Sequence, residues 1–190
     1  MACAASDAHA HAHKRRRALS AEFLFYHAGQ LMPGKSGTAG LTFTAVDSAL
    51  KAQGQPDEEE WPYSLSPPNP WNPPAVTMRW YGSLSTAAAG VAAIVKTIES
   101  GHPVILGVKL SAGFYSVPAA PFLIPAAGPG FGGHAVLGVG IADYAPAGEL
   151  ILIRNSWGSA WGDEGHAWLP TAYLHDKLIG YRTVAAGAPP

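Results

Sequence analysis

The residues best suited to chemistry in this chain lie at the ends of two neighbouring apolar runs. His134 opens the run His134–Ala142, and the next apolar run, Glu149–Asn155, closes with Asn155. Consecutive strands joined by a short connection pair as an antiparallel hairpin, so we expect the Asn155 side chain beside the His134 ring. An amide oxygen there accepts the imidazole N–H and fixes the tautomer of the ring. The other ring nitrogen is then free to act as a general base, which is the base-and-orienter pair of nucleophilic catalysis.

A glycine and a tryptophan flank this pair. Trp157 follows within the segment Asn155-Ser156-Trp157-Gly158, and we expect its ring to cover the His–Asn hydrogen bond and to keep water from it. Gly133 directly precedes the histidine and ends a glycine-rich stretch, and glycine lets a substrate backbone approach closely. We therefore assign Gly133 and Trp157 to substrate binding.

Three stretches around these residues form a wider pattern. They are Gly133-His134-Ala135-Val136, Ile151-Leu152-Ile153-Arg154-Asn155-Ser156-Trp157-Gly158 and Trp161-Gly162-Asp163-Glu164-Gly165. Together they resemble the papain-like cysteine peptidases, and weaker matches occur at Leu19-Ser20-Ala21-Glu22 and Glu60-Trp61-Pro62-Tyr63. The resemblance implies a helical lobe and a β lobe with an active-site cleft between them. It also implies peptide-bond hydrolysis by a thiolate–imidazolium pair, with His134 as base and ion-pair partner and Asn155 as its orienter.

This chain departs from the family pattern at the nucleophile. In the family, a cysteine begins the central helix and a glutamine upstream helps to form the oxyanion hole. Aligning Asp7-Ala8-His9 with bacterial members places the cysteine immediately before Met1, so we expect the chain as given to lack both groups. Cys3 is the alternative nucleophile, because a helix N-terminus lowers a thiol pKa, but it lies three residues along, about 4.5 Å down the helix axis. A non-catalytic peptide-binding homologue is the alternative function.

Three other motifs suggest nucleotide binding, metal binding or a basic patch, and each is weaker than the His134–Asn155 pattern. Gly29–Ser36 satisfies the phosphate-loop pattern G-x-x-x-x-G-K-[ST], but that loop should follow a buried strand, and here it follows a helix-like segment, so nucleotide binding is a third, less favoured function. His9 and His13 share a helix face, yet no third metal ligand is evident. The basic run Lys14–Arg17 suits the C-terminal end of a helix dipole.

The composition excludes several other classes of protein. Twelve basic residues against 13 acidic ones give a formal net charge of -1, so no overall field favours nucleic acid or an anionic membrane. The single cysteine excludes an intrachain disulfide and a cysteine-cluster metal site. Prolines interrupt the uncharged stretch Leu110–Ala142, and Met1–Arg17 lacks the apolar core of a signal peptide. We therefore expect a cytoplasmic monomer with a peptide or protein substrate, and no cofactor, metal, nucleic acid or membrane partner.

Helices are expected first along the chain and strands later. The predicted helices are Ala2–Arg17, a segment capped by Ser20 that runs to about Gln30, one that begins near Thr42–Thr44 and ends at Gly54, and Thr86–Ser100. In the third of these, Thr44 and Asp47 have the spacing of a capping box. The predicted strands are His102–Leu110, His134–Ala142, Glu149–Asn155, Gly165–Leu169 and Lys177–Val184.

This order indicates the α+β class. The proline-rich segment Pro56–Ala75 reads as an extended connection between two lobes. We therefore expect residues 1–75 to form the helical lobe and residues 76–190 to form an antiparallel β-sheet or barrel that carries the His/Asn pair.

Overall fold

The computed structural model describes residues 1–32, 40–66, 69–85 and 90–190, and these form two compact units. The β unit comprises Met1 and Thr86–Thr183, and the helical unit comprises Ala2–Ser85 and Val184–Pro190. The division falls after Ser85 instead of the predicted Ala75. The reason is that a backbone bridge from Gln55 to Trp80 and a short strand at 81–85 tie these residues to the helices.

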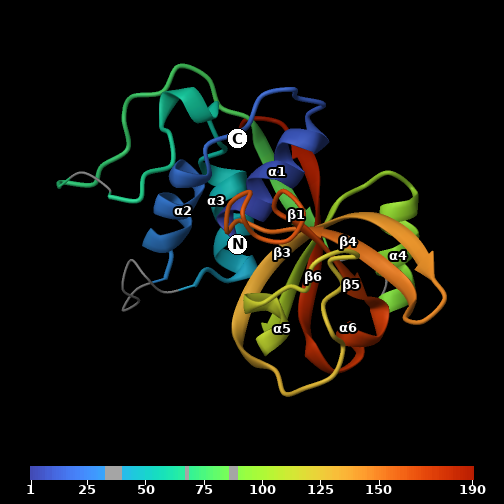
Figure 1. The fold of residues 1–190 in the computed structure, drawn as a ribbon. Coiled ribbons are helices and arrows are strands. Elements are labelled where there is room, and N and C mark those ends of the chain that lie inside the picture. Colours follow the sequence, from blue (N-terminus) through green and yellow to red (C-terminus); the bar gives the residue numbers. More distant parts are fainter. Residues whose placement is uncertain (33–39, 67–68, 86–89) are drawn as a thin grey trace. The chain divides into compact units, whose positions relative to one another are not determined.

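The helical unit is built from three helices and one strand (Figure 1). These are α1 (Ala2–Ala12), α2 (Ala21–Gln30), α3 (Phe43–Ala52) and β1 (Tyr81–Ser85), with a 3-10 turn at Glu58–Glu60. Helix α2 contacts both α1 and α3, and the buried core of this unit includes Phe23 and Leu24 of α2 together with Val46 and Leu50 of α3. No helix in the described ranges is long and apolar enough to cross a lipid bilayer.

Side-chain caps fix where two of these helices begin. The Ser20 hydroxyl accepts the Phe23 N–H at 3.0 Å, which confirms the predicted start of α2. Helix α3 begins within the predicted range near Thr42–Thr44, but its cap is Thr42, whose side chain accepts the Ala45 N–H at 3.2 Å. The predicted Thr44–Asp47 capping box is therefore wrong.

Helix α1 ends at Ala12, before the predicted Arg17. The chain turns at Lys14, which has a φ of 54°. Arg15 then leaves the helix direction, because its guanidinium binds both carboxylate oxygens of Asp57 at 2.5 and 2.7 Å and lies 4.4 Å from the ring of Trp80. This paired, stacked contact outweighs continued helix formation in a basic run.

The β unit carries most of the sheet. Its elements are α4 (Val91–Glu99), β2 (Val104–Leu110), α5 (Ala112–Tyr115), β3 (Phe131–Tyr144), β4 (Gly148–Arg154), β5 (His166–Pro170), α6 (Thr171–Lys177) and β6 (Leu178–Gly187), whose last residues lie in the helical unit. The strand order is β1-β6-β2-β3-β4-β5. The neighbouring pairs β6–β2, β2–β3, β3–β4 and β4–β5 are antiparallel. All five predicted strands are present, whereas β1, α5 and α6 were missed.

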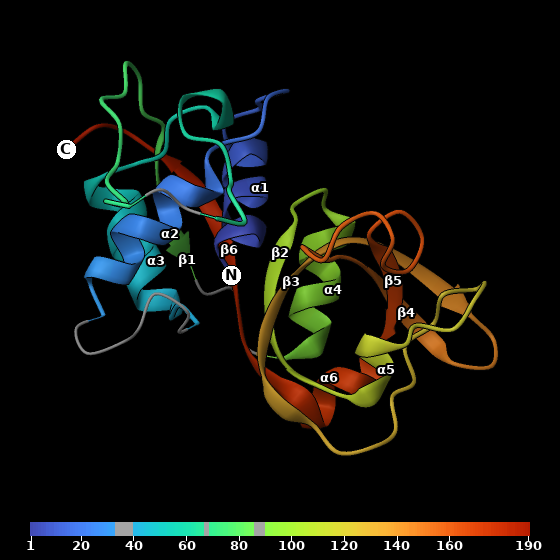
Figure 2. The ribbon, with the colours of Figure 1, turned by 60° about the vertical axis from the view of Figure 1, so that its left-hand side comes forward.

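The core of the β unit lies between α4 and the curved strands (Figure 2). Ile94 and Ile98 of α4 pack against buried residues of β2, β3 and β4. Gly138 of β3 permits this close approach, since a Cβ there would lie 2.9 Å from Ile98 Cδ1. The helix therefore holds β3, and with it the start of the strand where His134 lies.

Candidate active site

His134 and Asn155 form the hydrogen bond expected from the sequence. His134 lies on β3 opposite Val108 of β2, and Asn155 directly follows β4. His134 Nε2 lies 2.7 Å from Asn155 Oδ1, which also accepts the Ser156 N–H at 2.8 Å. An amide oxygen only accepts, so Nε2 carries the proton. The neutral ring therefore keeps the lone pair of Nδ1 for base chemistry.

The loop Trp161–Gly165, here called the clamp loop, holds Asn155 in place. The Asn155 N–H donates to the Gly165 carbonyl at 2.9 Å, and the Gly165 N–H donates to the Trp161 carbonyl at 2.8 Å. Gly162 has a φ of 59°, and a Cβ there would lie 2.1 Å from the His166 carbonyl oxygen. Only glycine fits this turn. The third stretch of the sequence pattern thus fixes the position of Asn155.

Trp157 lies against the histidine ring. The centroids of the Trp157 and His134 rings are 4.9 Å apart with an interplanar angle of 40°, and Trp157 also contacts Trp161 edge-on at 6.1 Å. Gly133 is exposed, with Ile179 Cδ1 3.4 Å from the position of an added Cβ. Trp157 therefore covers part of the His134 ring, while the roles of Trp157 and Gly133 toward a substrate stay predictions.

Burial sets the protonation state of His134. Burial lowers the pKa of the His134 imidazole, the hydrogen bond to Asn155 raises it, and the charged α-amino group of Met1 lowers it. The net direction is downward, because removing an imidazolium from water is costly. The ring is therefore neutral at neutral pH, which is the state that a general base requires.

The Cys3 thiol lies in a different setting from the one expected. Cys3 is half-buried near the start of α1 in the helical unit. Burial raises the pKa of its thiol and the charge of Asp7 adds to this, against a smaller lowering by the α-amino group. The expectation that the helix N-terminus lowers this pKa is wrong, since desolvation of the thiolate outweighs the helix end.

The other sequence motifs lie outside this site. His9 Nδ1 bonds to Gln55 Oε1 at 2.8 Å and His13 Nε2 bonds to the Tyr81 carbonyl at 2.6 Å, so each ring has a protein partner. Within the described residues, no three His, Cys, Asp or Glu side chains gather closely enough to hold a metal ion. Of the phosphate-loop pattern Gly29–Ser36, the first two residues end α2, and Pro33–Ser36 lie outside the described residues.

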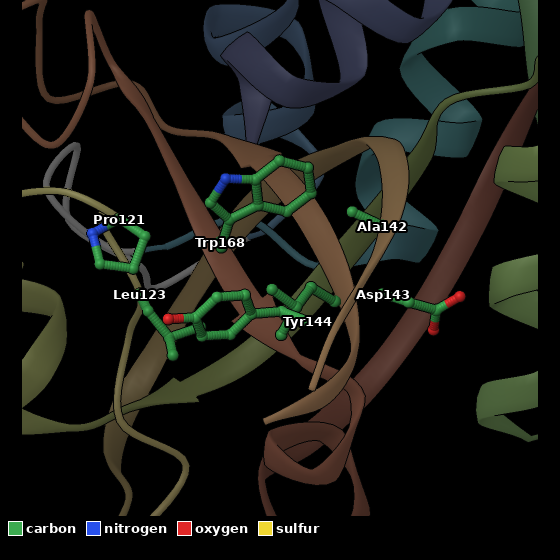
Figure 3. Close-up of a pocket in the computed structure, with 7 residues that line it drawn as sticks. Pro121, Leu123, Ala142, Asp143, Tyr144 and Trp168 are labelled. Atoms are coloured by element: carbon green, nitrogen blue, oxygen red, sulfur yellow. The ribbon is translucent and has the colours of Figure 1, made fainter. Parts of the chain in front are cut away.

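A separate pocket of about 190 Å³ lies at the other end of β3 (Figure 3). Its lining is Pro121, Leu123, Ala142, Asp143, Tyr144, Leu150 and Trp168. In Figure 3 the Asp143 carboxylate points away from the Tyr144 and Trp168 rings, which leaves an apolar lining. Ala142 lies eight residue steps along the strand from His134, roughly 26 Å along an extended chain. The pocket therefore does not share the chemistry of the His–Asn pair.

Two aromatic residues beside the site were missed by the sequence analysis. Tyr115 of α5 stacks on Trp157 with centroids 5.3 Å apart, and Phe131 of β3 stacks on Tyr115 at 6.0 Å. Neither residue lies in a periodic pattern, because α5 is a single turn and Phe131 follows a glycine–proline segment. Only the tertiary structure brings these rings to His134.

The comparisons with known proteins agree with this fold. The family model described as papain family cysteine protease matches residues 2–179, and the chain belongs to this family. A cathepsin L-like peptidase of Aedes aegypti is 27% identical over 159 residues, which cover 80% of this chain and 46% of that protein. The chain thus spans about half the length of this curated relative.

Solved structures share the fold. Xylellain, a cysteine protease from Xylella fastidiosa, matches 98% of this chain and 80% of its own with a TM-score of 0.77 and 21% identity. The bromelain protease from Ananas comosus, solved with an inhibitor, matches 97% of this chain and 85% of its own with a TM-score of 0.69 and 16% identity. The predicted α+β, papain-like fold class is confirmed.

Proposed function

We propose that this chain carries the base and the orienting amide of a cysteine-type endopeptidase. The observation that carries the proposal is the 2.7 Å bond from His134 Nε2 to Asn155 Oδ1, which leaves Nδ1 free at the start of a strand. Family membership supports a peptide or protein substrate. The half-buried, oriented and neutral imidazole has the properties of a base that activates a thiol.

In the proposed mechanism, His134 acts twice. Its Nδ1 takes the proton of a thiol, and the resulting thiolate attacks the scissile carbonyl carbon. The imidazolium then gives that proton to the leaving amine, and the acyl group remains as a thioester. Water hydrolyses the thioester with His134 again as base, which releases the acid and restores the thiol. Asn155 holds the ring plane through both proton transfers.

We place the thiol at the residue that would precede Met1 in a longer chain. Met1 groups with the β unit, and the charge of its α-amino group lowers the pKa of His134. A residue joined to that nitrogen would therefore lie near the imidazole. The competing nucleophile is Cys3, whose raised thiol pKa disfavours a thiolate.

The test compares the given chain with one extended upstream of Met1 by the coding sequence. Both are treated with a peptide epoxide that alkylates activated thiols, and both are assayed with fluorogenic peptides. We expect labelling and turnover only in the extended chain, at the cysteine before Met1, with turnover lost in His134→Ala and kept in Cys3→Ala.

Two other results would contradict this placement. Labelling at Cys3 alone, with turnover abolished by Cys3→Ala, would assign the nucleophile to Cys3. Peptide binding without turnover in the extended chain would favour the alternative function, a non-catalytic peptide-binding homologue; the single cysteine of the given chain is the observation that keeps this alternative open.

A further inference from the structure

Lys177 is a buried lysine that the proposed mechanism does not use. It is the last residue of α6 and is only 5% exposed. Among the residues that the structure describes, no carboxylate forms an ion pair with it. Removing an ammonium group from water is costly unless other groups of the protein compensate the charge. The surroundings of this side chain must therefore supply partners for it.

Two neighbours compensate the buried charge. Lys177 Nζ donates a hydrogen bond to the Ala126 carbonyl at 2.9 Å, and it lies 4.8 Å from the centroid of the Tyr173 ring. Tyr173 is itself fixed, because its hydroxyl donates to the Lys109 carbonyl at 2.8 Å. The face of an aromatic ring attracts a cation, and a charged donor forms a stronger hydrogen bond than a neutral one does. The ammonium group therefore holds the Ala126 carbonyl in one place.

This carbonyl belongs to a segment that has few other anchors. Residues 126–133, here called the glycine segment, lead from the connection after α5 into the start of β3 (Figure 2). Half of its residues are glycines, namely Gly128, Gly130, Gly132 and Gly133. Within the described ranges, no backbone–backbone hydrogen bond holds residues 125–130. Because glycine has the greatest backbone freedom to lose, this segment needs an external constraint to keep one conformation.

The aliphatic part of Lys177 supports the same segment. A Cβ on Gly130 would lie 3.4 Å from Lys177 Cγ and 2.8 Å from Lys109 Cβ, so the backbone at Gly130 packs on both lysine side chains. Gly130 is accordingly half-buried, whereas residues 127–129 and 131–133 are exposed. Lys177 thus contacts the glycine segment twice, through its aliphatic stem and through its ammonium group.

We propose that Lys177 is a positioning residue, which holds the glycine segment in the conformation that receives the backbone of a peptide substrate. This inference rests on the proposed function, because the segment ends at Gly133, directly before His134. A segment that is fixed before the peptide arrives loses little conformational entropy on binding. Burial of an ammonium group stabilises a fold only weakly, so the role of Lys177 lies in the local conformation that it fixes.

Lys177→Met tests this role directly, because methionine keeps an unbranched apolar stem and lacks the ammonium group. We expect the heteronuclear NOE values of the Gly128, Gly130 and Gly132 amides to fall, since the segment gains motion on the picosecond-to-nanosecond scale. The midpoint of thermal unfolding should change little, because replacing a buried charge by an apolar side chain of similar shape is often neutral or stabilising. Lys96→Met, at an exposed lysine of α4, is the matched control and should alter neither quantity.

Peptide binding is measured in the given chain, where no catalysis is needed. One of the fluorogenic peptides used for turnover is titrated into each variant and followed by isothermal titration calorimetry. We expect Lys177→Met to weaken binding about tenfold, because ordering the backbone of one additional residue on binding costs about that factor. Lys96→Met should bind the peptide as the unmodified chain does.

Turnover by the extended chain distinguishes positioning from a merely structural role. Lys177→Met should raise KM about tenfold and leave kcat within about twofold, because the segment binds the substrate equally before and during the reaction. A residue needed only for folding would lower the fraction of active enzyme, which reduces kcat at unchanged KM.

Several results would overturn the proposal. They are the absence of peptide binding by the unmodified chain, unchanged NOE values or unchanged affinity in Lys177→Met, and a fall in kcat at unchanged KM. Loss of the folded NMR spectrum in Lys177→Met would assign the residue to folding and would also overturn it. Weaker peptide binding by Lys177→Met, with no hydrolysis by the unmodified extended chain, would refute the peptidase proposal alone.

Discussion

At the scale of single residues, the proposed chemistry depends on one nitrogen atom. Asn155 Oδ1 accepts a hydrogen bond from the protonated Nε2 of His134. The lone pair of Nδ1 is therefore left to accept the thiol proton. Burial lowers the pKa of the ring, and the bond to Asn155 opposes this by favouring the protonated form. The orienting amide therefore has a second effect, which is to strengthen the base.

Asn155→Ala should lower the pKa of His134 below its value in the unmodified chain, because the bond that favours imidazolium is lost while burial remains. The measurement is an NMR titration of the imidazole Cε1–H signals, with the His134 signal assigned by its absence in His134→Gln. An unchanged or raised pKa would show that Asn155 does not act on the ring as described.

The same substitution should also reduce turnover of the extended chain. An imidazole free to rotate places Nδ1 wrongly for most encounters, and a misplacement of about 1 Å can cost about 10²-fold in rate. We expect a fall of that order in kcat with a smaller change in KM. A loss confined to KM would instead assign Asn155 to substrate binding.

Sequence predicted the His134–Asn155 contact but not the surroundings of Cys3 or Tyr115. The contact follows from local rules, since two apolar runs joined by a short turn must pair with their open ends together. The pKa of the Cys3 thiol depends on which residues cover it, and the stacking of Tyr115 depends on where a one-turn helix lies. Both are set by tertiary packing, which no spacing along the chain reveals.

At the scale of structural elements, the clamp loop Trp161–Gly165 holds Asn155, the residue that directly follows β4. It supplies the carbonyl that holds the Asn155 N–H, and it closes only because Gly162 has no Cβ. A side chain at Gly162 would meet backbone, which cannot move aside as the tip of a side chain can.

Gly162→Ala should therefore open the clamp loop. We expect amide hydrogen exchange at Asn155 to accelerate by at least about tenfold, because its N–H loses the Gly165 acceptor. Gly148→Ala is the matched control: Gly148 also has positive φ, 74°, but an added Cβ meets nothing within 4 Å. It should show only the conformational cost of about 1 kcal/mol, with Asn155 still protected. Equal protection in both variants would rule out the clamp.

Elements with strong local signals were predicted, and those defined by long-range contacts were not. The Ser20 cap located α2, and the apolar spacing of Ile94 and Ile98 located α4. Helix α6 was missed, because its seven residues carry too few turns to show a helical period. Strand β1 is a short run whose neighbour in the sheet, β6, lies about a hundred residues away.

At the scale of the whole molecule, the fold class was predictable and the division into units was not. Helices followed by strands indicate an α+β protein from order alone. The division depends on the chain's end, since Val184–Pro190 belongs to the helical unit and Gly187 lies beside Gly82. A boundary drawn from composition alone, at the proline-rich segment, misses such a return of the chain.

The helical unit contains a buried polar network that the sequence analysis did not predict. Gln55 is fully buried; its Oε1 accepts from His9 Nδ1 at 2.8 Å, and its amide nitrogen donates to Ser6 Oγ at 2.6 Å and to the Ser20 carbonyl at 2.8 Å. His9 is likewise fully buried, and its Nε2 faces Gly82 without a hydrogen-bond partner. Protonating this ring would place an uncompensated charge in the core.

This network should make the stability of the protein fall in mild acid. Burial lowers the pKa of His9, with the Gln55 bond opposing it, and burial also lowers the pKa of His27 and of His134. In the unfolded chain these rings bind a proton near pH 6.5, while the folded chain still resists it. The contribution of these neutral rings to the free energy of unfolding is therefore fully present above that pH and decreases below it.

We expect the midpoint of thermal unfolding, measured by circular dichroism, to drop between pH 7.5 and pH 5.5. His9→Gln should make this drop smaller, whatever its effect at pH 7.5, since one of the three rings no longer titrates. His175→Gln, on the exposed side of α6, should leave the drop unchanged. A midpoint that stays level or rises toward pH 5.5, or a drop of the same size in His9→Gln, would show that the buried ring does not couple proton binding to folding.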